Sequence, residues 1–329
     1  MARTRRRTLL TTTAAAALAL GLAGAARAQD DYPDRPVTII AAAAPGGPTD
    51  VITRIVAEAM TRHMPQPVVV ENTGPAHVGA QRVAQARPDG YTLLMTNVGM
   101  AAGATLFRHL AFDTATAFAP LGLVSDAAMT VIARPGFPAT DLAGLLADLR
   151  ARGEALNLGT AGLGSAANLC GLLLQQAAGN RATIVGFRGT GPAIGELLAG
   201  RLDLLCDQAT NTVPFIRDGR IRAYAVSSPA RLPGLPEVPT TAEAGAPGLA
   251  MSTWHGLYAP AGTPVAVQER ISVALQAALR EERLRTRFAE LATEPATPER
   301  ASIAFHRRFH AEEIARWRPI IQAAGAYAD

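Results

Sequence analysis

Lysine is absent from the 329-residue chain, and cysteine occurs only twice. Without lysine, Schiff-base chemistry and phosphate binding through a lysine ammonium are excluded, and no lysine-containing phosphate loop can form. Charged residues make up 18% of the chain and hydrophobic residues 49%. This composition is that of an ordinary globular protein with about two domains, and it excludes a disordered chain or a small disulfide scaffold.

Excess positive charge is confined to the N-terminal segment. The formal net charge is +4, but five of the 31 basic residues lie among the first 28 residues, which contain no acid. The remainder of the chain carries 26 basic and 27 acidic residues. Because nucleic-acid binding needs a basic surface in the working protein, no nucleic-acid partner is expected.

The first 28 residues have the pattern of an export signal. Arginines 5–7 precede an uncharged run at 14–26, and Ala26-Arg27-Ala28 has the small-x-small form of a cleavage site. We predict cleavage after Ala28 and a periplasmic location. A retained membrane anchor is the alternative, but the run is short for a bilayer span of about 20 residues. Both general secretory and twin-arginine export fit the segment.

The two cysteines, Cys170 and Cys206, lie in apolar sequence surroundings. We expect two buried free thiols. A disulfide stays open, because an export compartment permits one and sequence spacing cannot establish it.

Short apolar runs alternate with helical patterns and glycine-rich turns, which is typical of parallel α/β units. Strands are expected at residues 37–42, 68–71, 91–96, 129–133, 156–159, 183–187, 202–206 and 222–226. Helices are expected near 50–63, 78–86, 142–152, 166–178 and 193–199.

From Pro264 onward the pattern indicates helices alone. One apolar stripe contains Val267, Ile271, Leu275 and Leu279, and a second contains Phe305, Phe309, Ile314, Trp317 and Ile321. Helices without strands of their own must pack on a sheet built earlier. We therefore predict one domain from residues 29–126 and 253–329, and a second from 127–252, with two crossings between them. The proline-rich stretch 227–248 is expected to be a surface loop.

Three predicted strands end in glycine-rich turns that open helices. These turns are Pro45-Gly46-Gly47-Pro-Thr-Asp50, Thr160-Ala-Gly-Leu-Gly164-Ser165 and Arg188-Gly189-Thr190-Gly-Pro192. Ligands of open α/β sheets bind at the carboxyl ends of strands, where helix N-termini favour anions. The turns together predict one anion site. Each alone could instead be a tight turn or a helix start, with Ser165 a helix cap and Pro192 a first-turn residue.

Signals for catalysis, cofactors and metals are weak. No Gly-x-Ser-x-Gly elbow occurs, and the loose string Gly189-Thr-Gly191 with Gly195 lacks the acid of a dinucleotide site. His306 and His310 are four residues apart but flank two arginines without a third ligand, so a solvated helix flank is expected. We expect no catalytic residues, no cofactor and no metal.

Motifs along nearly the whole chain resemble the extracytoplasmic solute receptors of tripartite tricarboxylate transporters, the Bug-type binding proteins. They are residues 32–40 (YPDRPVTII), 45–50 (PGGPTD), 87–94 (RPDGYTLL), 118–120 (FAP), 162–165 (GLGS), 187–189 (FRG) with Pro192, 198–203 (LAGRLD), 236–240 (PEVPT) with 243–245 (EAG), and 259–264 (APAGTP).

The resemblance implies an α/β fold with two domains, a type II-like periplasmic-binding-protein clamshell with the ligand cleft between the domains. It implies a monomer that captures a small organic carboxylate and delivers it to membrane permease subunits. A receptor that feeds a sensor kinase is one alternative. A secreted enzyme acting on a small organic acid is another, although no Ser/His or Cys/His pair can be placed together.

Within this family resemblance, the first turn would hold a ligand carboxylate and Asp50 a water or a ligand amine. Arg188 would hold the distal carboxylate or else pair with Asp207. The expected ligand-binding residues are Pro45, Gly46, Gly47, Asp50, Thr96, Asn97, Thr160, Gly164, Ser165, Asn168, Arg188, Gly189, Thr190 and Asp207. Two departures from the family pattern, the short segment 71–79 with Pro75 and His77, and Asn168 in place of a histidine, indicate that the ligand need not be a common di- or tricarboxylate.

Overall fold

The computed structural model describes residues 32–327. The predicted export signal and its cleavage site lie outside these residues. In chain order the elements are β1 (Val37–Ala41), α2 (Pro48–Thr61), β2 (Val68–Asn72), α3 (Ala76–Ala84), β3 (Thr92–Asn97), α4 (Gly99–Leu106), β4 (Phe118–Ala133), α5 (Leu142–Arg152), β5 (Asn157–Thr160), α6 (Ala166–Ala178), β6 (Thr183–Gly186), α7 (Thr190–Leu198), β7 (Leu204–Gln208), α8 (Ala209–Arg217), β8 (Arg222–Val226), β9 (Ser252–Pro260), α9 (Val265–Leu279), α10 (Glu282–Glu290), β10 (Thr293–Pro295) and α11 (Ile303–Ala324).

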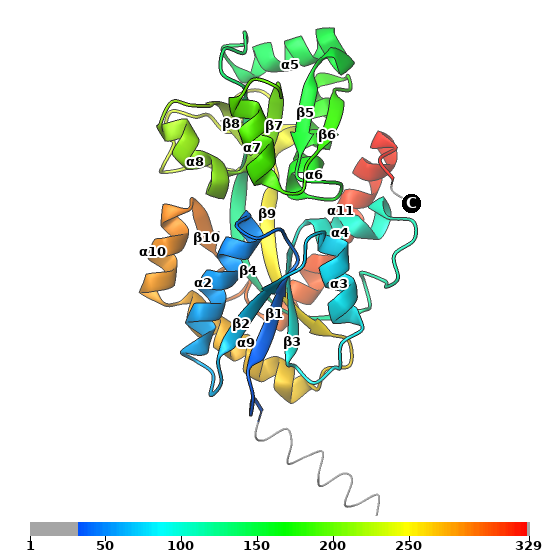
Figure 1. Cartoon of the computed structure of the whole chain (residues 1–329), viewed down its shortest axis with the longest axis vertical. Helices are drawn as coiled ribbons and strands as arrows, with labels where there is room; N and C mark the ends of the chain where they lie inside the picture. The colour runs from blue at the N-terminus through cyan, green and yellow to red at the C-terminus, as the bar shows by residue number, and fades with distance from the viewer. Residues whose placement is uncertain (1–31, 328–329) are drawn as a thin grey trace, which may run out of the picture.

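Strand β4 joins two groups of strands into one sheet of order β2-β1-β3-β9-β4-β7-β5-β6. Its first part pairs with β9 and β10, and its last five residues pair with β7 and β8. Figure 1 shows β4 and β9 running from the lower group, with β1–β3, into the upper group, with β5–β8. The molecule is therefore a mixed α/β structure in which two long strands connect an upper and a lower set of elements.

The predicted parallel pairing is present only within each group. Strands β1–β3 are parallel to one another, as are β5–β7, whereas β4 and β9 pair antiparallel with their neighbours. The prediction missed β9 and the first eleven residues of β4, which contain Pro120 and Gly122. Register shifts at these residues accommodate the proline and glycine as bulges.

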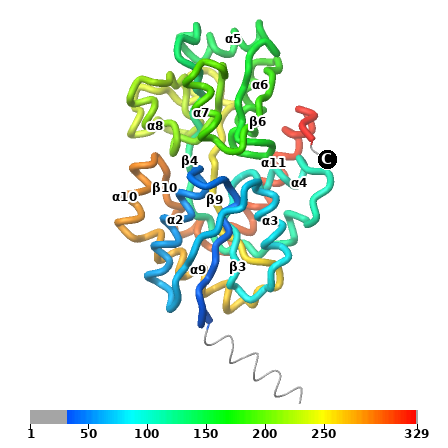
Figure 2. Tube along the Cα trace, viewed as in Figure 1, coloured from blue at the N-terminus to red at the C-terminus, as the bar shows by residue number. Residues whose placement is uncertain are grey.

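The C-terminal helices pack on the lower part of the sheet. The predicted stripe of α9, from Val267 to Leu279, is buried, and both α9 and α11 contact β4. Helix α11 also lies beside α4, as the trace in Figure 2 shows. The prediction of helices alone after Pro264 is wrong in one place, because the short strand β10 pairs with β4 between α10 and α11.

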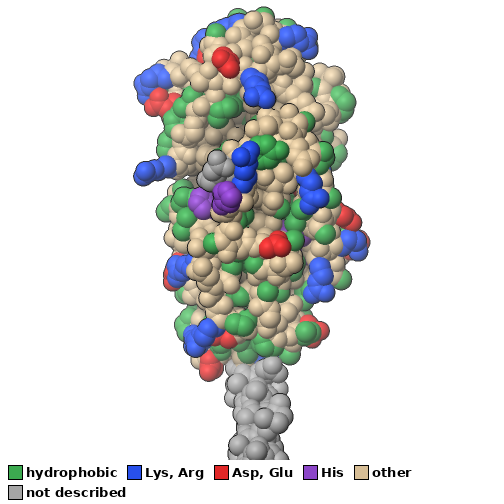
Figure 3. All heavy atoms as spheres, turned by 90° about the vertical axis from the view of Figure 1, so that its right-hand side faces the viewer, with side chains coloured by type: hydrophobic (Ala, Val, Ile, Leu, Met, Phe, Trp, Pro, Cys, Tyr) green, Lys and Arg blue, Asp and Glu red, His purple; other side chains and the backbone are tan. Residues whose placement is uncertain are grey.

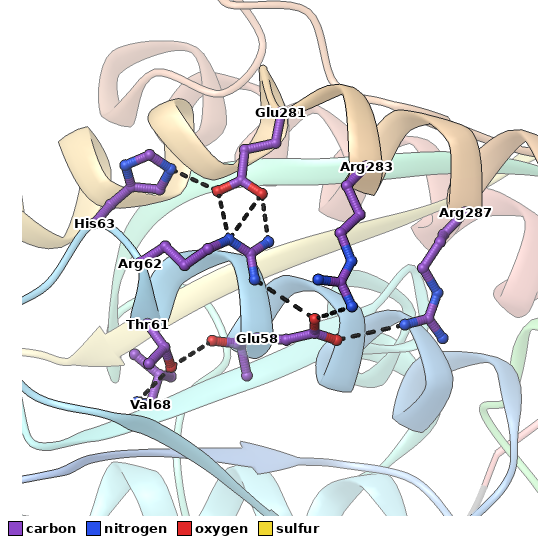
Figure 4. A network of polar contacts seen from close by, with 9 residues as sticks. Glu58, Thr61, Arg62, His63, Val68, Glu281, Arg283 and Arg287 are labelled. Atoms are coloured by element: carbon purple, nitrogen blue, oxygen red, sulfur yellow. Dashed lines mark hydrogen bonds and ion pairs between the residues drawn. The ribbon is translucent and has the colours of Figure 1, made fainter.

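Helix α2 and the C-terminal helices are joined by a network of charged side chains (Figure 4). Glu281 accepts hydrogen bonds from Arg62 and contacts His63 at 2.7 Å. Glu58 pairs with Arg283 at 2.9 Å and with Arg287 at 3.4 Å. Because these side chains are partly exposed, each pair adds little stability, and the network mainly fixes how α9 and α10 lie against α2.

Two sequence expectations are corrected by the structure. Cys170 and Cys206 are not free thiols but form a disulfide between α6 and β7. The buried faces of α6 and β7 that carry the two cysteines pack against each other, and the spacing of the cysteines in the sequence cannot show this. His306 and His310 are not a solvated flank but are buried, because α11 turns this face toward Gly122, Tyr258 and the core.

Candidate functional site

A cavity of about 720 Å³ lies where the carboxyl ends of β1, β3, β5, β6 and β7 approach one another. Its first wall consists of residues 42–45, 47–49, 74–77, 97 and 107. Its second wall consists of residues 161–167, 187–190, 207 and 208. The cavity therefore lies between the lower and upper groups of elements, at the turns singled out by their glycines.

The structure brings nine of the expected ligand-binding residues to the cavity. These are Pro45, Gly47, Asn97, Gly164, Ser165, Arg188, Gly189, Thr190 and Asp207. The other five, Gly46, Asp50, Thr96, Thr160 and Asn168, are not among its lining residues. Most of these five residues lie behind the lining, where their hydrogen bonds hold the turns in position.

The turn after β1 is held from within. Gly46 adopts a φ of +75°, its N–H donates to Asp50 Oδ2 at 2.8 Å, and the N–H of Gly47 donates to the Ala44 carbonyl at 3.2 Å. Burial alone would raise the pKa of Asp50, but hydrogen bonds from Gly46 and Asn72 and the Arg54 guanidinium outweigh it and hold that pKa below its usual range. Asp50 thus fixes the turn, and the glycine N–H groups expected to bind an anion are already bonded.

Behind the first wall a chain of buried polar groups ends at Thr49. The Thr49 hydroxyl accepts from Asn97 Nδ2 at 3.1 Å and lies 3.3 Å from His255 Nε2. The other ring nitrogen of His255 lies 3.1 Å from Ser125 Oγ. Burial lowers the pKa of His255 to about 3, so the ring is neutral at neutral pH. This chain orients the Thr49 hydroxyl at the cavity edge.

The second wall begins with the turn after β5. Ser165 caps α6 by accepting from the Asn168 N–H at 3.1 Å, and its hydroxyl donates to the Gly162 carbonyl at 2.7 Å. The Asn168 side-chain oxygen accepts from the Gly164 N–H at 3.1 Å. The cap role considered for Ser165 from sequence is therefore present, together with a place in the cavity wall.

Arg188, Asp207 and Gln208 are the second wall's most exceptional polar residues. The exposed Arg188 has no ion pair or hydrogen bond within the described part of the chain, and so it does not pair with Asp207. Asp207 is 1% exposed, and burial raises its pKa to about 7 despite hydrogen bonds from the Gln208 N–H and Asn211. Gln208 Oε1 is buried without a hydrogen-bond partner among residues 32–327.

The lower and upper groups of elements approach each other closely at two glycines. A Cβ atom on Gly99, at the start of α4, would lie 2.3 Å from the Gly164 carbonyl oxygen. A Cβ on Gly189 would lie 3.2 Å from the Ala44 Cβ. A side chain at Gly99 would therefore hold the two groups of elements apart, and the φ of +113° favours glycine at Gly189.

Apolar side chains fill the rest of the lining. Phe107, Leu163 and Phe187 line the cavity, and the His77 ring lies 5.4 Å from the Phe107 ring. Sequence analysis did not single out Phe107, Thr49 or Gln208, although Thr49 stands inside the first turn motif and Gln208 follows Asp207 directly. Phe107 gave no signal, because it follows a helix that was not predicted.

No group of three or more histidine, cysteine or acidic side chains that could hold a metal ion occurs in the described residues. No helix in residues 32–327 is both long enough and apolar enough to cross a bilayer. On the face drawn in Figure 3, arginines are scattered among acidic and apolar side chains and do not gather into one patch.

Comparisons with known proteins agree with this geometry. A family model described as the tripartite tricarboxylate transporter family receptor matches residues 52–326. The periplasmic binding protein BugD is 36% identical, with a TM-score of 0.85 over 91% of this chain and 100% of its own. MatC (Rpa3494) from Rhodopseudomonas palustris, solved with bound malate, is also 36% identical, with a TM-score of 0.84 over 88% of this chain and 100% of its own.

A third structure, Rpa4515 from R. palustris with adipate, is 29% identical, with a TM-score of 0.81 over 90% of this chain and 99% of its own. The fold is therefore the periplasmic-binding-protein fold of BugD and MatC, and such relatives bind carboxylates. The family is one of binding proteins and not of enzymes. The chain belongs to the tripartite tricarboxylate transporter receptor family, as an extracytoplasmic solute receptor of the Bug type.

Proposed function

We propose that this protein captures a small organic carboxylate in the cavity between its two walls and delivers it to the membrane subunits of a tripartite transporter. The observation that carries the proposal is Arg188, a cavity-lining guanidinium without an ion pair in residues 32–327. A guanidinium presents two parallel donors that match a carboxylate, and such a pair strengthens when water is excluded. The malate and adipate complexes of relatives support a carboxylate as the ligand.

The first wall would supply further donors to the acid. Pro48, the first residue of α2, has no N–H, so the free N–H groups of the first helical turn belong to Thr49 and Asp50. The positive end of the helix dipole favours an anion at the same place. We assign the ligand contacts of this wall to the free N–H groups of that turn and to the Thr49 hydroxyl. The Asp50 carboxylate and Gly46 hold the turn in position.

We further propose that residues 29–126 and 253–329 form one domain and residues 127–252 the other, with β4 and β9 as the two crossings. The two domains would open and close about these strands, as clamshell receptors do around their ligands. The contacts Gly99–Gly164 and Ala44–Gly189 would then be made in the closed form. We propose a monomer that is exported to the periplasm and cleaved after Ala28.

Titration calorimetry of the cleaved chain with a panel of small acids tests the proposal. We expect one acid molecule bound per chain, a smaller radius of gyration in solution scattering with the acid present, and a large loss of affinity in Arg188→Gln. Saturable binding of a sugar or a cation, with no response to any acid, would contradict it. Turnover of a bound acid would instead favour an enzyme.

A further inference from the structure

In the part of the chain that the structure describes, the second wall contains a buried carboxyl group without a cation and a buried amide oxygen without a donor. Asp207 and Gln208 end strand β7, line the cavity and are 1% and 4% exposed. The Asp207 carboxylate receives hydrogen bonds from Asn211 Nδ2, at 3.2 Å, and from the Gln208 N–H, but it has no ion pair in the described residues. Gln208 Oε1 has no hydrogen-bond partner within residues 32–327.

Asn211 does not fully satisfy this part of the wall. Its amide group donates to Thr190 Oγ1 at 2.6 Å as well as to Asp207 Oδ2. These two contacts use both hydrogens of the Asn211 amide, so none remains for Gln208 Oε1. A buried acceptor without a donor destabilises the folded chain, and a ligand that supplies the donor removes that cost.

The same two acceptors exclude certain ligands. A second carboxylate placed beside Asp207 would meet a buried carboxyl group and no cation of the described residues, which is unfavourable in a site of low dielectric. Arg188, on the same wall, is the place for a carboxylate. The wall therefore distinguishes an acidic end of the ligand from an end that carries a donor hydrogen.

We propose that the ligand is an organic acid that bears a hydroxyl or amino group, with its carboxylate toward Arg188 and its donor hydrogen shared by Asp207 and Gln208. This inference rests on the proposed function and names the ligand class for the same cavity. The burial that raises the pKa of Asp207 also means that an ammonium group would favour the ionised carboxylate, whereas a hydroxyl can donate to either form.

Binding of matched acids tests the inference. Titration calorimetry would compare succinate with L-malate and L-aspartate, and adipate with 2-hydroxyadipate and 2-aminoadipate. In at least one of these sets we expect the hydroxy or amino acid to bind at least about tenfold more tightly than the plain acid, because one buried acceptor gains its donor. Equal or tighter binding of the plain acids would overturn the inference and leave the proposed function standing. Binding of none of the six acids would count against both.

Gln208→Met removes the acceptor at nearly constant volume. It should weaken binding of the hydroxy acid more than binding of the plain acid, so that most of the preference between them is lost. Gln176→Met, on the exposed face of α6 in the same group of elements, is the control and should change neither. Asp207→Asn should reduce the preference for the amino acid over the hydroxy acid. If Gln208→Met does not fold, the comparison of acids on the unaltered protein decides the question.

Discussion

The two walls of the cavity differ in how their polar side chains, and those directly behind them, are satisfied. In the first wall Gly46 is bonded to Asp50, and Asn97, Thr49 and His255 are bonded in a chain. In the second wall Arg188 and Gln208 Oε1 have no partner within residues 32–327, and Asp207 has no cation. A saturated wall is preorganised and costs little to desolvate, whereas an unsaturated one is stabilised by its ligand. We infer that the first wall binds the acid through groups held in fixed positions, and that the second wall, with Arg188, Asp207 and Gln208, determines which acids bind.

Asp207→Asn should produce the largest change in stability, because it removes a buried group of the unsaturated wall. The pKa of Asp207 is about 7 in the folded chain and close to 4 in an unfolded one. Since the folded state holds the proton more tightly, wild-type stability is greatest below about pH 4 and falls as the pH rises to about 7. Asp207→Asn does not have this titration. Without ligand, the variant should therefore become more stable relative to wild type by about 2–4 kcal/mol as the pH rises from 4 to 8.

Urea unfolding of both proteins at several pH values would measure this difference. Burial lowers the pKa values of His255, His306 and His310, so these residues make stability rise as the pH increases. They are present in both proteins, and the subtraction removes their contribution. A difference that stays constant from pH 4 to pH 8 would show that Asp207 titrates normally.

Arg188→Gln should cause the largest loss of affinity, about 100-fold for the preferred acid, because the bound carboxylate loses its charged, two-pronged donor. Arg188→Lys, which keeps the charge but loses the fork, should cost about tenfold. The unfolding midpoint without ligand should hardly move, since Arg188 has no intramolecular partner in the described residues.

Arg152→Lys is the matched control for this change, because Arg152 is exposed at the end of α5, away from the cavity lining. Calorimetry and thermal unfolding on the same samples separate the two roles of Arg188. A lower unfolding midpoint of the Arg188 variants with unchanged affinity would make Arg188 a structural residue that does not contact the ligand.

Gly99→Ala tests whether the two walls must meet. The added methyl group would lie 2.3 Å from the Gly164 carbonyl, so the walls should be held apart at a cost of about 1–3 kcal/mol. We expect affinity to fall by about tenfold or more and the radius of gyration with acid to stay near the unliganded value. Gly103→Ala, in the same helix with its nearest neighbour at 3.7 Å, should bind normally. Equal binding by both variants would contradict closure at Gly99.

Asp50→Ala should have the smallest effect, and it should act on the saturated wall. Loss of the bonds to Gly46 and Arg54 should destabilise the protein by about 1–2 kcal/mol at pH 7. Because the folded pKa of Asp50 is depressed, this contribution is present above about pH 4 and is lost as the pH falls through the folded pKa. Urea unfolding of the variant and wild type should therefore converge in acid. Weaker binding without any loss of stability would instead make Asp50 a direct ligand contact.

Much of the fold could be predicted where local pattern and tertiary structure agree. Helix α6 has the expected bounds because Ser165 caps its start and Gly179 ends it in the left-handed conformation. The same reasoning failed for the first part of β4, whose Pro120 and Gly122 are typical of turns and are accommodated only by bulges against β9. Helix α8 was missed for a similar reason, since it contains Pro214.

The candidate site could be located from its turns but not described from them. Sequence placed Gly47, Ser165 and Arg188 near one cavity because the carboxyl ends of parallel strands meet. It could not show that Asp50 points back to Gly46, nor that Arg188 and Asp207 do not pair. Such details depend on side-chain directions set by distant residues, as does the link between the two cysteines.

Mass spectrometry of the small molecules that co-purify with the periplasmically expressed protein would show which ligand the cavity holds. We expect one molecule per chain, an organic acid with a hydroxyl or amino group, which is lost from Arg188→Gln prepared in parallel and retained by Arg152→Lys. Recovery of a neutral or purely cationic molecule, bound equally by all three proteins, would contradict it.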